Sequence, residues 1–312
     1  MIQRYNSLSD YMKKTYGKKM VKLSLDGGFS CPNRDGTLSS SGCVFCSEEG
    51  SGDFSGLIVN GEKCKNIDLA MQVESQKKLL SSKWNDCGYI GYFQSYTNTY
   101  KPLEDLENLY GEALNCEGVE GLVIATRPDC VNDKHIELFK RFNVLWVEIG
   151  LQTIHDDRAG WLNRHYDMIA FEKTFQLLKN AGIPVVVHLI AGLPNETKMD
   201  FLKSIDYITA IKPFGIKLHM LHIVKNTPLA KIYSERPFEL LDEEEYIEWI
   251  CEAISKLHPK IVIHRLTGDG KKEDVLAPSW IFNKRHVLNH INKRLNTMEI
   301  MQGDQVKTMV VD

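Results

Sequence analysis

Residues 21–46, a strand-like run followed by a cysteine-rich loop, read Val21-Lys-Leu-Ser-Leu-Asp-Gly-Gly-Phe-Ser-Cys31-Pro-Asn-Arg-Asp-Gly-Thr-Leu-Ser-Ser-Ser-Gly-Cys43-Val-Phe-Cys46. Eleven residues separate the first two cysteines and two separate the last pair. Clustered thiols bind zinc or iron–sulfur clusters, and a closed site usually takes four protein ligands. Three thiols directly after a strand therefore indicate a metal site with one open position.

The composition is that of an ordinary globular protein, because 43% of the 312 residues are hydrophobic and 25% are charged. This length suits one large α/β barrel with an appendage. Residues 1–10 lack the apolar core of an export signal, and no apolar run approaches the roughly 20 residues of a membrane span. We expect a soluble, cytoplasmic protein without membrane contact. Five further cysteines are expected to be small packing residues, namely Cys64, Cys87, Cys116, Cys130 and Cys251.

Short apolar runs alternate with segments of helical periodicity, which is typical of βα units around a parallel sheet. Strands are expected at residues 21–25, 89–94, 121–126, 144–151, 184–190 and 215–223. Helices are expected at residues 68–84, 103–114, 169–180 and 198–211. Six units do not close an eight-stranded barrel, so we predict an α/β fold with a partial (β/α)6 barrel whose functional end lies at the strand C-termini.

The pattern changes after residue 228. An acidic helix is expected at residues 241–257, a strand at 261–265, a turn at 267–270 and a basic helix at 281–295. We therefore predict a core barrel with an N-terminal segment at residues 1–228 and a C-terminal α/β extension, packed on the barrel, at residues 229–312.

The net charge of −3 gives no overall signature of nucleic-acid binding. Two local basic clusters remain, and each is either a solvated helix face or an RNA contact. The N-terminal cluster consists of Lys13, Lys14, Lys18, Lys19 and Lys22. The C-terminal cluster consists of Lys284, Arg285, His286, His290, Lys293 and Arg294.

Two kinds of metal site fit the cysteine loop. Cys64 would complete a closed zinc or iron–sulfur site with Cys31, Cys43 and Cys46. Alternatively, Cys31, Cys43 and Cys46 alone hold a cubane cluster whose fourth iron is free to bind a cofactor. In that case Phe45, inside the last cysteine pair, is expected to pack beside the bound ligand.

The loop resembles that of the radical S-adenosylmethionine (SAM) superfamily. A shorter first spacing is usual there, but long spacings occur in the branch related to the catalytic subunit of Elongator. Residues 25–37 look like a bacterial radical SAM family within that branch. The resemblance implies an enzyme with a [4Fe-4S] cluster, held by Cys31, Cys43 and Cys46. It also implies SAM, an external one-electron reductant such as flavodoxin or ferredoxin, and cleavage of SAM to a 5′-deoxyadenosyl radical.

Residues 91–97 are similar to the family segment that receives the methionine amino group. Gln94, Ser95 and Thr97 offer the hydrogen-bonding groups that an ammonium and a carboxylate need. A polar loop after a strand is the plain alternative.

Residues 148–153 end an expected strand. By resemblance Glu148 would hold the ribose hydroxyls, with Gln152 beside them; a buried Glu148 paired with Arg127 is the alternative. Arg164 is the candidate clamp for the methionine carboxylate, since a guanidinium binds it bidentately. His165 stands where the family has glycine, which leaves its role open.

Residues 188–197 resemble a family segment that receives the adenine, with Asn195 in place of a glycine. His188 and Gly192 are the candidate contacts, and a satisfied core position is the other interpretation of His188.

In the expected strand 215–223, a period of two places Lys217, His219 and Leu221 on one face. We expect Lys217 and His219 to point into the barrel toward the substrate, although a structural ion pair and a core position would also account for them. Cys130 is a candidate donor of a second hydrogen atom, with a packing role as the alternative.

Kinship to the Elongator branch implies tRNA as a partner, with modification of the C5 side chain of the wobble uridine. A specific step is the conversion of a carboxymethylaminomethyl group to aminomethyl. Two other functions remain open. One is a radical SAM enzyme acting on a small-molecule or porphyrin-type substrate, and the other is a non-catalytic zinc or iron–sulfur binding protein.

Overall fold

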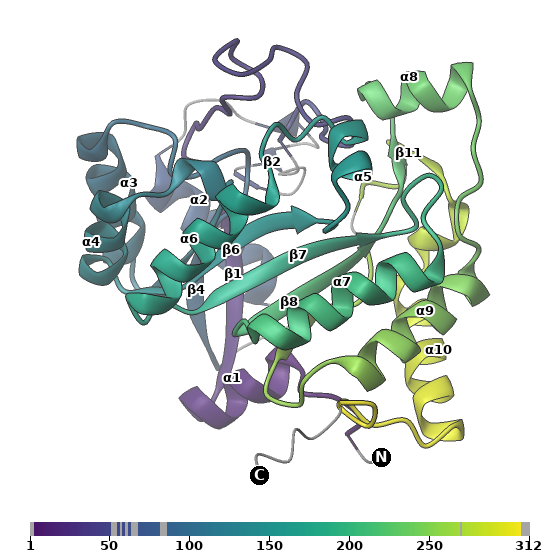
Figure 1. Ribbon diagram of the computed structural model, residues 1–312. Helices are drawn as coiled ribbons and strands as arrows, with labels where there is room; N and C mark the ends of the chain where they lie inside the picture. Colours follow the sequence, from purple (N-terminus) through teal and green to yellow (C-terminus); the bar gives the residue numbers. More distant parts are fainter. Residues whose placement is uncertain are drawn as a thin grey trace. The chain divides into compact units, whose positions relative to one another are not determined.

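The computed structural model describes residues 3–50, 55–56, 58–59, 62–63, 68–81, 86–268 and 270–306. The strands are β1 (Lys19–Leu25), β2 (Ile58–Val59), β3 (Glu62–Lys63), β4 (Cys87–Phe93), β5 (Val119–Thr126), β6 (Val144–Gln152), β7 (Val185–Ala191), β8 (Gly215–Met220), β9 (Ile223–Val224), β10 (Val262–Arg265) and β11 (Val275–Ala277) (Figure 1). The helices are α1 (Leu8–Tyr16), α2 (Leu69–Ser81), α3 (Leu103–Asn115), η1 (Pro128–Cys130), α4 (Asp133–Arg141), α5 (Asp156–Trp161), α6 (Met168–Asn180), α7 (Lys198–Ile211), α8 (Pro228–Glu235), α9 (Glu243–Lys256), η2 (Ser279–Phe282) and α10 (Lys284–Thr297).

The chain forms two compact units, and each is described by itself. The first unit contains Met1–Tyr11, Leu151–Trp161 and Val187–Asp312, and the second contains Met12–Gly150 and Leu162–Val186. Cys64, residues 82–84 of an expected helix and Asp269 of the expected turn lie outside the described residues.

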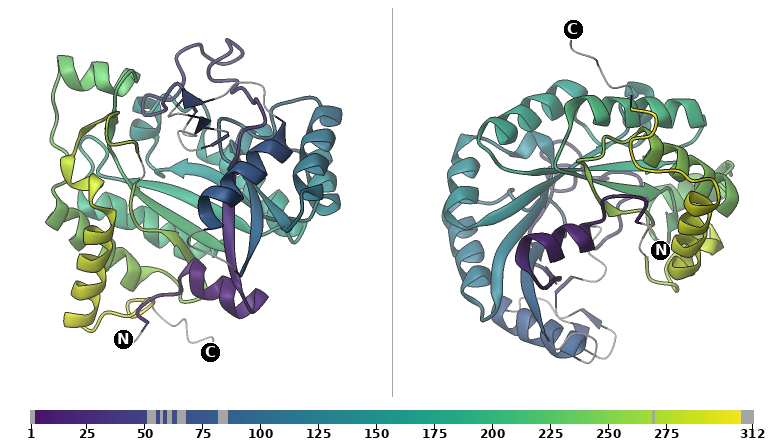
Figure 2. Two further views of the ribbon diagram at one scale, coloured as in Figure 1. Left: turned by 180° about the vertical axis from the view of Figure 1, so that it is seen from behind. Right: turned by 90° about the horizontal axis from the view of Figure 1, so that it is seen from below.

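In the second unit the parallel strand order is β1-β4-β5-β6, followed by the first residues of β7. The register of β1 on β4 runs from Lys19 opposite Cys87 to Leu25 opposite Phe93. Continuous apolar runs such as 122–124 in β5 are fully buried, as expected for strands covered on both faces. Helices α2 and α3 pack on β1 and β5, and the blue and teal helices line one side of these strands in Figure 2.

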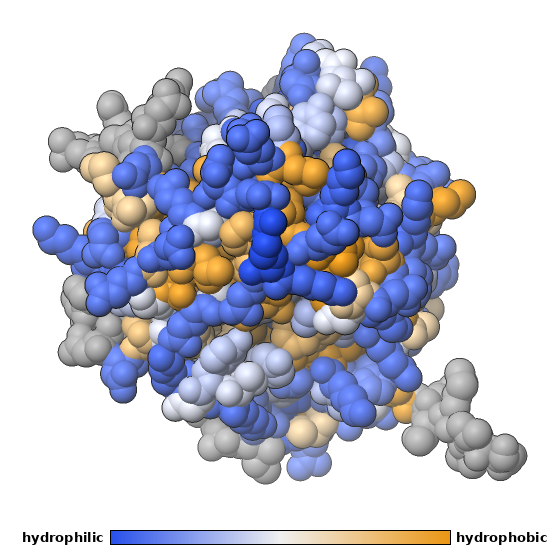
Figure 3. Space-filling view, turned by 90° about the vertical axis from the view of Figure 1, so that its left-hand side faces the viewer, coloured by the Kyte–Doolittle hydropathy of each residue, from blue (hydrophilic) through white to orange (hydrophobic). Residues whose placement is uncertain are grey.

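Helices α3 and α4 are amphipathic because each has one buried side and one side exposed to solvent. Each helix buries one apolar stripe and exposes charged side chains, and the exposed Arg141 of α4 pairs with Glu107 of α3 at 2.6 Å. Hydrophilic side chains dominate the face drawn in Figure 3, with smaller apolar areas between them.

In the first unit the parallel order is β7-β8-β10. The run 261–265, expected in a C-terminal extension, joins this sheet as β10, with Val262 opposite Gly215. The expected strand 215–223 is too long, because β8 ends at Met220 and the Leu221 N–H donates to the Ala191 carbonyl. Leu221 therefore does not share a strand face with Lys217, and β9 pairs antiparallel with β11 instead.

Polar caps fix where the helices of the first unit begin. Thr197 and Asp200 form a capping box at the start of α7, and Asp242 and Glu245 form another at the start of α9. The Asn283 side chain accepts from the backbone N–H of His286 at the start of α10. These caps set the ends of α9 and α10, which pack against each other.

Six expected strands form β1, β4, β5, β6, β7 and β8, and β10 adds a further parallel strand. The prediction of an α/β fold with a partial parallel barrel is confirmed. None of the helices in the described ranges is long and apolar enough to cross a membrane.

Candidate functional site

The cysteine loop leaves β1 and makes a closed detour between its first two cysteines. The carbonyl of Cys31 accepts from the N–H groups of Arg34 and Asp35 at 2.8 and 3.1 Å. The carbonyl of Pro32 accepts from the N–H groups of Leu38 and Ser39 at 2.8 and 3.4 Å. The chain therefore returns beside Cys31 before it continues to Cys43.

Arg34 ties the two halves of the loop together. Its guanidinium donates to the carbonyls of Cys46 and Ser47 at 2.7 and 2.6 Å. Gly42 lies against the same side chain with a φ of +74°, and a Cβ there would lie 2.9 Å from the Arg34 Nε. A glycine is therefore required next to Cys43.

A second loop of the same unit, residues 162–166, braces the cysteines. The Asn163 side-chain amide donates to the Gly42 carbonyl at 2.7 Å, and the Val44 N–H donates to the Leu162 carbonyl at 3.0 Å. In return, the Asn33 Nδ2 donates to the Asn163 carbonyl at 2.6 Å and to the Cys43 Sγ at 3.4 Å. Sequence reasoning missed Asn33; its place two residues after Cys31 was the available signal.

The electrostatics show that the three thiols are neighbours. Burial, with smaller contributions from nearby Cys46 and Cys31, raises the pKa of the Cys43 thiol to about 12. The Arg127 guanidinium and the Asn33 amide act in the opposite direction, because both favour the thiolate. Metal ligation requires that thiolate, so Arg127 and Asn33 favour the ligating form of the cysteine.

The donor set fits a cluster better than a single ion. Cys31, Cys43 and Cys46 offer three thiols, one fewer than the four protein ligands of a closed structural zinc site. A cubane cluster binds each thiolate at a different iron, and soft thiolates suit iron–sulfur chemistry.

Arg127, at the end of β5, is a second residue that sequence reasoning did not place at the site. Its guanidinium donates to both oxygens of Asp129 at 2.9 and 2.7 Å and to the Arg164 carbonyl at 2.9 Å. Arg127 therefore pairs with Asp129, and the alternative in which it neutralises Glu148 is wrong. The Tyr166 ring lies 4.9 Å from the Arg127 guanidinium and 4.8 Å from that of Arg164. Arg164 is 1% exposed, which limits its guanidinium to contacts inside the fold.

Glu148 lies in the middle of β6 and is 1% exposed. It accepts from the Tyr92 hydroxyl at 2.7 Å and from the Trp146 indole N–H at 3.1 Å, and the Lys22 ammonium lies 3.6 Å away. These donors explain how a carboxylate is tolerated between apolar strands.

The segment after β4 adjoins the first cysteine. The Thr97 N–H donates to the carbonyl of Ser30, the residue before Cys31, at 3.2 Å. The Thr97 hydroxyl is buried and has no hydrogen-bond partner among the residues that the structure describes. An unsatisfied hydroxyl beside the cluster loop fits a site for a polar ligand such as SAM. Of the other expected contacts, Ser95 is buried against Ser55, and Gln94 and Phe45 are half-buried.

The first unit carries the other predicted residues. The rings of His188 and His219 lie 5.5 Å apart, and Lys217 of the same β8 face is 2% exposed. Burial holds the pKa of His219 well below its usual value, and the charge of Arg265 and the nearby His188 and Lys217 add to this effect. His219 is therefore neutral at pH 7, and the structure brings these three residues together.

Gly192, at the end of β7, has a conformation that other residues rarely adopt. Its φ is +80°, and a Cβ would lie 2.8 Å from the Leu241 side chain. Its N–H donates to the Glu196 carboxylate at 2.9 Å. Burial raises the pKa of Glu196 to about 7, and the other oxygen of this carboxylate has no partner within the described part of the chain.

Both departures from the family motifs fall at left-handed backbone positions. His165 has a φ of +56° and Asn195 a φ of +59°. Gln152, at the end of β6, also has a positive φ of +59°. The glycines that His165 and Asn195 replace in the family pattern would adopt this conformation without strain.

Cys130 lies in η1, directly after β5. Burial raises the pKa of its thiol to about 12, with smaller contributions from Asp129 and from Cys31. The thiol is therefore protonated at neutral pH and lies near Cys31.

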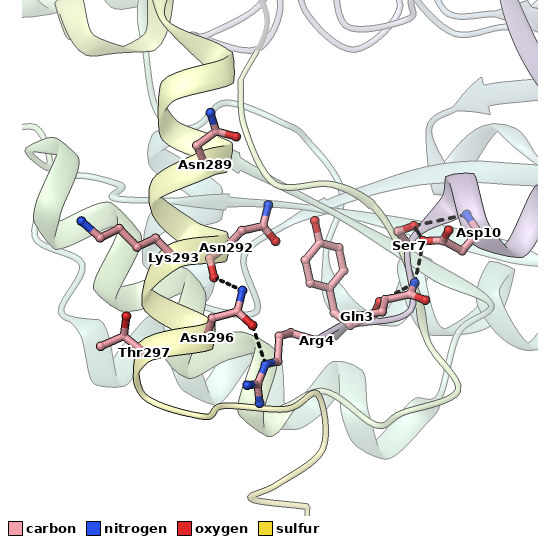
Figure 4. A pocket seen from close by; sticks show the side chains of 10 residues that line it. Gln3, Arg4, Ser7, Asp10, Asn289, Asn292, Lys293, Asn296 and Thr297 are labelled. Carbon is pink, nitrogen blue, oxygen red and sulfur yellow. Dashed lines mark hydrogen bonds between the residues drawn. The ribbon is translucent and has the colours of Figure 1, made fainter. Parts of the chain in front are cut away.

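A separate cavity of about 680 Å³ lies in the first unit, between the N-terminal segment and α10 (Figure 4). The residues that line it include Arg4, Asn292, Lys293 and Asn296, and the Arg4 guanidinium donates to the Asn296 amide oxygen at 2.9 Å. None of the predicted cofactor or catalytic residues lines it.

Comparison with known proteins agrees with this geometry. The profile of the radical SAM superfamily matches residues 32–208, and that of the radical SAM C-terminal domain matches residues 213–297. The chain is 38% identical over 304 residues to YtqA of Bacillus subtilis (strain 168), covering 96% of this chain and 92% of that protein.

Two further similarities concern Elongator. The chain is 28% identical over 152 residues to Elongator complex protein 3 of Schizosaccharomyces pombe, covering 48% of this chain and 28% of that protein. The structure of archaeal Methanocaldococcus infernus Elp3 shares the fold, with a TM-score of 0.67 and 20% identity over 76% of this chain and 61% of that one. Our chain thus matches only about three fifths of that Elp3 structure. With its three-thiol loop and its two matching profiles, the chain belongs to the radical SAM superfamily, whose members use a [4Fe-4S] cluster and SAM.

Proposed function

We propose that this radical SAM enzyme acts on tRNA, where it converts a carboxymethylaminomethyl group at C5 of the wobble uridine to aminomethyl. The observation that carries the proposal is the similarity to Elongator complex protein 3, together with the long Cys31–Cys43 spacing typical of that branch. Cytoplasmic location and an external reductant such as flavodoxin or ferredoxin are parts of the same proposal.

The cofactors are assigned to the residues described above. Cys31, Cys43 and Cys46 ligate the cluster, and Asn33 and Arg127 stabilise the thiolate of Cys43. The SAM contacts are proposed to be Phe45, Gln94, Ser95, Thr97, Glu148, Gln152, Arg164, His188 and Gly192. Thr97 has the most direct support, because its buried hydroxyl adjoins the cluster loop.

The proposed reaction balances without a further oxidant. Removing the carboxymethyl group as glyoxylate, with one water added, takes two electrons from the substrate. When bound, the cluster and SAM would supply the matching reduction, since cleavage of SAM to methionine and 5′-deoxyadenosine would take up the hydrogen that the substrate loses. The electron from the reductant starts the reaction and is returned when the substrate is oxidised.

Lys217 and His219 would hold the substrate. Lys217 is buried on the face of β8 that also carries His219, so its ammonium can bind the substrate carboxylate in a low-dielectric site. His219 is neutral, and its Nε2 is buried without a hydrogen-bond partner in the described ranges. It can therefore accept a hydrogen bond from the water that adds to the oxidised substrate and orient that water.

Cys130 has no part in this oxidation, because the substrate radical gives up an electron and does not need a hydrogen atom from a thiol. Its protonated thiol would serve a redox-neutral reaction, in which a substrate radical is quenched by hydrogen transfer. A requirement for Cys130 would therefore favour a different radical reaction at the same site.

A small-molecule or porphyrin-type substrate is the second candidate. It is favoured by ion pairs that neutralise some cations of each basic cluster, which leaves fewer cations for contact with RNA. Lys18 pairs with Glu120 at 2.6 Å, and Arg294 pairs with Glu244. The exposed cations that remain for RNA include Lys13 and Lys14 in the second unit and Arg285 and Lys293 in the first.

The substrate is tested by comparing tRNA nucleosides from cells with and without the gene. We expect the deletion strain to accumulate the carboxymethylaminomethyl nucleoside, and the wild-type gene to restore the aminomethyl form. Complementation with Cys43→Ser or Lys217→Met should fail, whereas the exposed control Lys173→Ala should succeed. An unchanged wobble uridine would defeat the tRNA assignment in favour of the small-molecule substrate.

A further inference from the structure

Two histidines and one carboxylate converge on the surface of the first unit, where α9 and α10 lie side by side (Figure 1). The His286 Nε2 and the His290 Nδ1 lie 3.2 and 3.0 Å from the same Glu243 oxygen. All three ligand atoms are within 4.8 Å of one another, and the two imidazole rings are 4.2 Å apart.

We propose that Glu243, His286 and His290 bind a divalent first-row transition-metal ion of the Zn²⁺ class. Two imidazoles and a carboxylate are a common protein ligand set for Zn²⁺, with water in the fourth position. Ligand atoms on a tetrahedral ion with bonds of about 2.0–2.1 Å lie roughly 3.3 Å apart. The two imidazole–carboxylate distances are already close to this value.

The backbone holds these side chains in place before an ion binds. His286 and His290 are one turn apart on α10, so they share one face of the helix. Asn283 caps the start of α10 by accepting from the His286 N–H, and the Asp242–Glu245 capping box fixes the start of α9 beside Glu243. A site built on two packed helices needs little rearrangement on binding.

Further contacts lock the two helices together. Val287, Ile291 and Leu295 of α10 form a buried stripe, and Arg294 pairs with Glu244 of α9. The ligand side chains themselves remain accessible, with 48%, 42% and 25% of their surface exposed for His286, His290 and Glu243. An ion can therefore enter from solvent and would clamp the start of α9 to α10.

The ligands of this site differ from those of the cysteine loop, because none of them is a thiol. The two histidines also belong to the C-terminal basic cluster considered as an RNA contact. Their convergence on Glu243 gives them a local partner, and a bound ion would occupy the imidazole nitrogens. The inference does not depend on the substrate of the enzyme.

The test is Zn²⁺ titration by calorimetry of the full-length protein, anaerobic and with its cluster assembled, so that Cys31, Cys43 and Cys46 are occupied. We expect one Zn²⁺ per chain, and at least about tenfold weaker binding in His286→Ala and in His290→Ala. The control His258→Ala, a half-buried histidine of the same unit, should bind like the wild type.

A second measurement covers variants that fold poorly. Zn²⁺ should raise the melting temperature of the wild type but not of His286→Gln/His290→Gln or of Glu243→Gln. Co²⁺ should give the visible absorption of a tetrahedral site in the wild type alone. Equal Zn²⁺ binding by wild type and double variant, or no binding above the His290→Ala level, would overturn the proposal.

Discussion

The amide of Asn33 donates to the sulfur of Cys43 at 3.4 Å, across ten positions of the cysteine loop. The same nitrogen donates to the Asn163 carbonyl at 2.6 Å, which fixes its direction. Asn33 is 0% exposed, so this contact is shielded from water. A cluster is easier to reduce when a thiolate ligand accepts a buried hydrogen bond, because the donor stabilises the added negative charge.

Replacing Asn33 with alanine should lower the reduction potential of the cluster and weaken iron retention by about 10- to 100-fold. An anaerobic redox titration and iron analysis would measure both effects. The matched control is Asn163→Ala, which keeps the amide that donates to Cys43. An unchanged potential in Asn33→Ala, or the same loss in the control, would contradict the assignment.

Serine at Cys31, Cys43 or Cys46 should abolish cluster assembly, because each thiolate is expected to hold a different iron. The reconstituted wild type should contain about four irons and four sulfides per chain. Cys130→Ser should retain the full cluster and should still cleave SAM. Stoichiometric zinc in the wild type would instead indicate a closed structural site.

Glu196 should make the folded state less stable as the pH rises. Its folded pKa of about 7 is above its ordinary value of 4.5, so the folded state holds the proton more tightly than the unfolded state. The free energy of unfolding should therefore fall between about pH 4.5 and pH 7, by roughly 3 kcal/mol at most.

The matched variant is Glu196→Gln, whose amide oxygen can still accept from the N–H of Gly192. Urea unfolding of both proteins from pH 5 to pH 8 gives the difference. The variant should gain stability relative to the wild type as the pH rises, and parallel curves would rule out the raised pKa.

His165→Gly and Asn195→Gly should each stabilise the protein by up to about 1 kcal/mol, because both positions have a left-handed backbone. The gain should be larger for His165, since the short polar side chain of asparagine can hydrogen-bond locally and so tolerates positive φ. Lys173→Gly, in the exposed middle of α6, should cost about 1 kcal/mol instead. Thermal unfolding measures all three, and destabilisation by both glycine variants at positive φ would refute this account.

If tRNA is the substrate, Arg285→Ala/Lys293→Ala should weaken its binding and reduce the slope of log affinity against log salt by about 1 for each lost phosphate contact. Arg294→Ala on the same helix is the control, because Arg294 is already paired with Glu244. Filter binding at several salt concentrations would compare them. Equal effects of the two changes would argue against a phosphate contact at this surface.

The parallel strands were predicted well, because each buried strand is a continuous apolar run that is too short to be a helix. The prediction failed at Met220, because apolar residues continue at Leu221 and Ile223 although the strand ends. Hydrogen bonding to Ala191 turns the chain there, and the local sequence contains no trace of that partner.

The candidate site shows the same division. Cys31, Cys43 and Cys46 could be proposed as cluster ligands because their spacing is local, and the resemblance supplied the order of the later motifs. Asn33 and Arg127 were missed because their roles arise from contacts with distant loops. His286 was predicted as part of a basic helix face, since the 42 residues that separate it from Glu243 concealed their contact.

Because of the closed turn at Pro32, the number of residues between Cys31 and Cys43 does not determine how far apart these two cysteines lie. Leu38 and Ser39 both return to the Pro32 carbonyl, so the residues between them and Pro32 form a side excursion. Shortening or lengthening such an excursion leaves its two ends where they were, at a small entropic cost. A search that demands a fixed number of residues between cysteines would therefore overlook chains whose ligands are equally well placed.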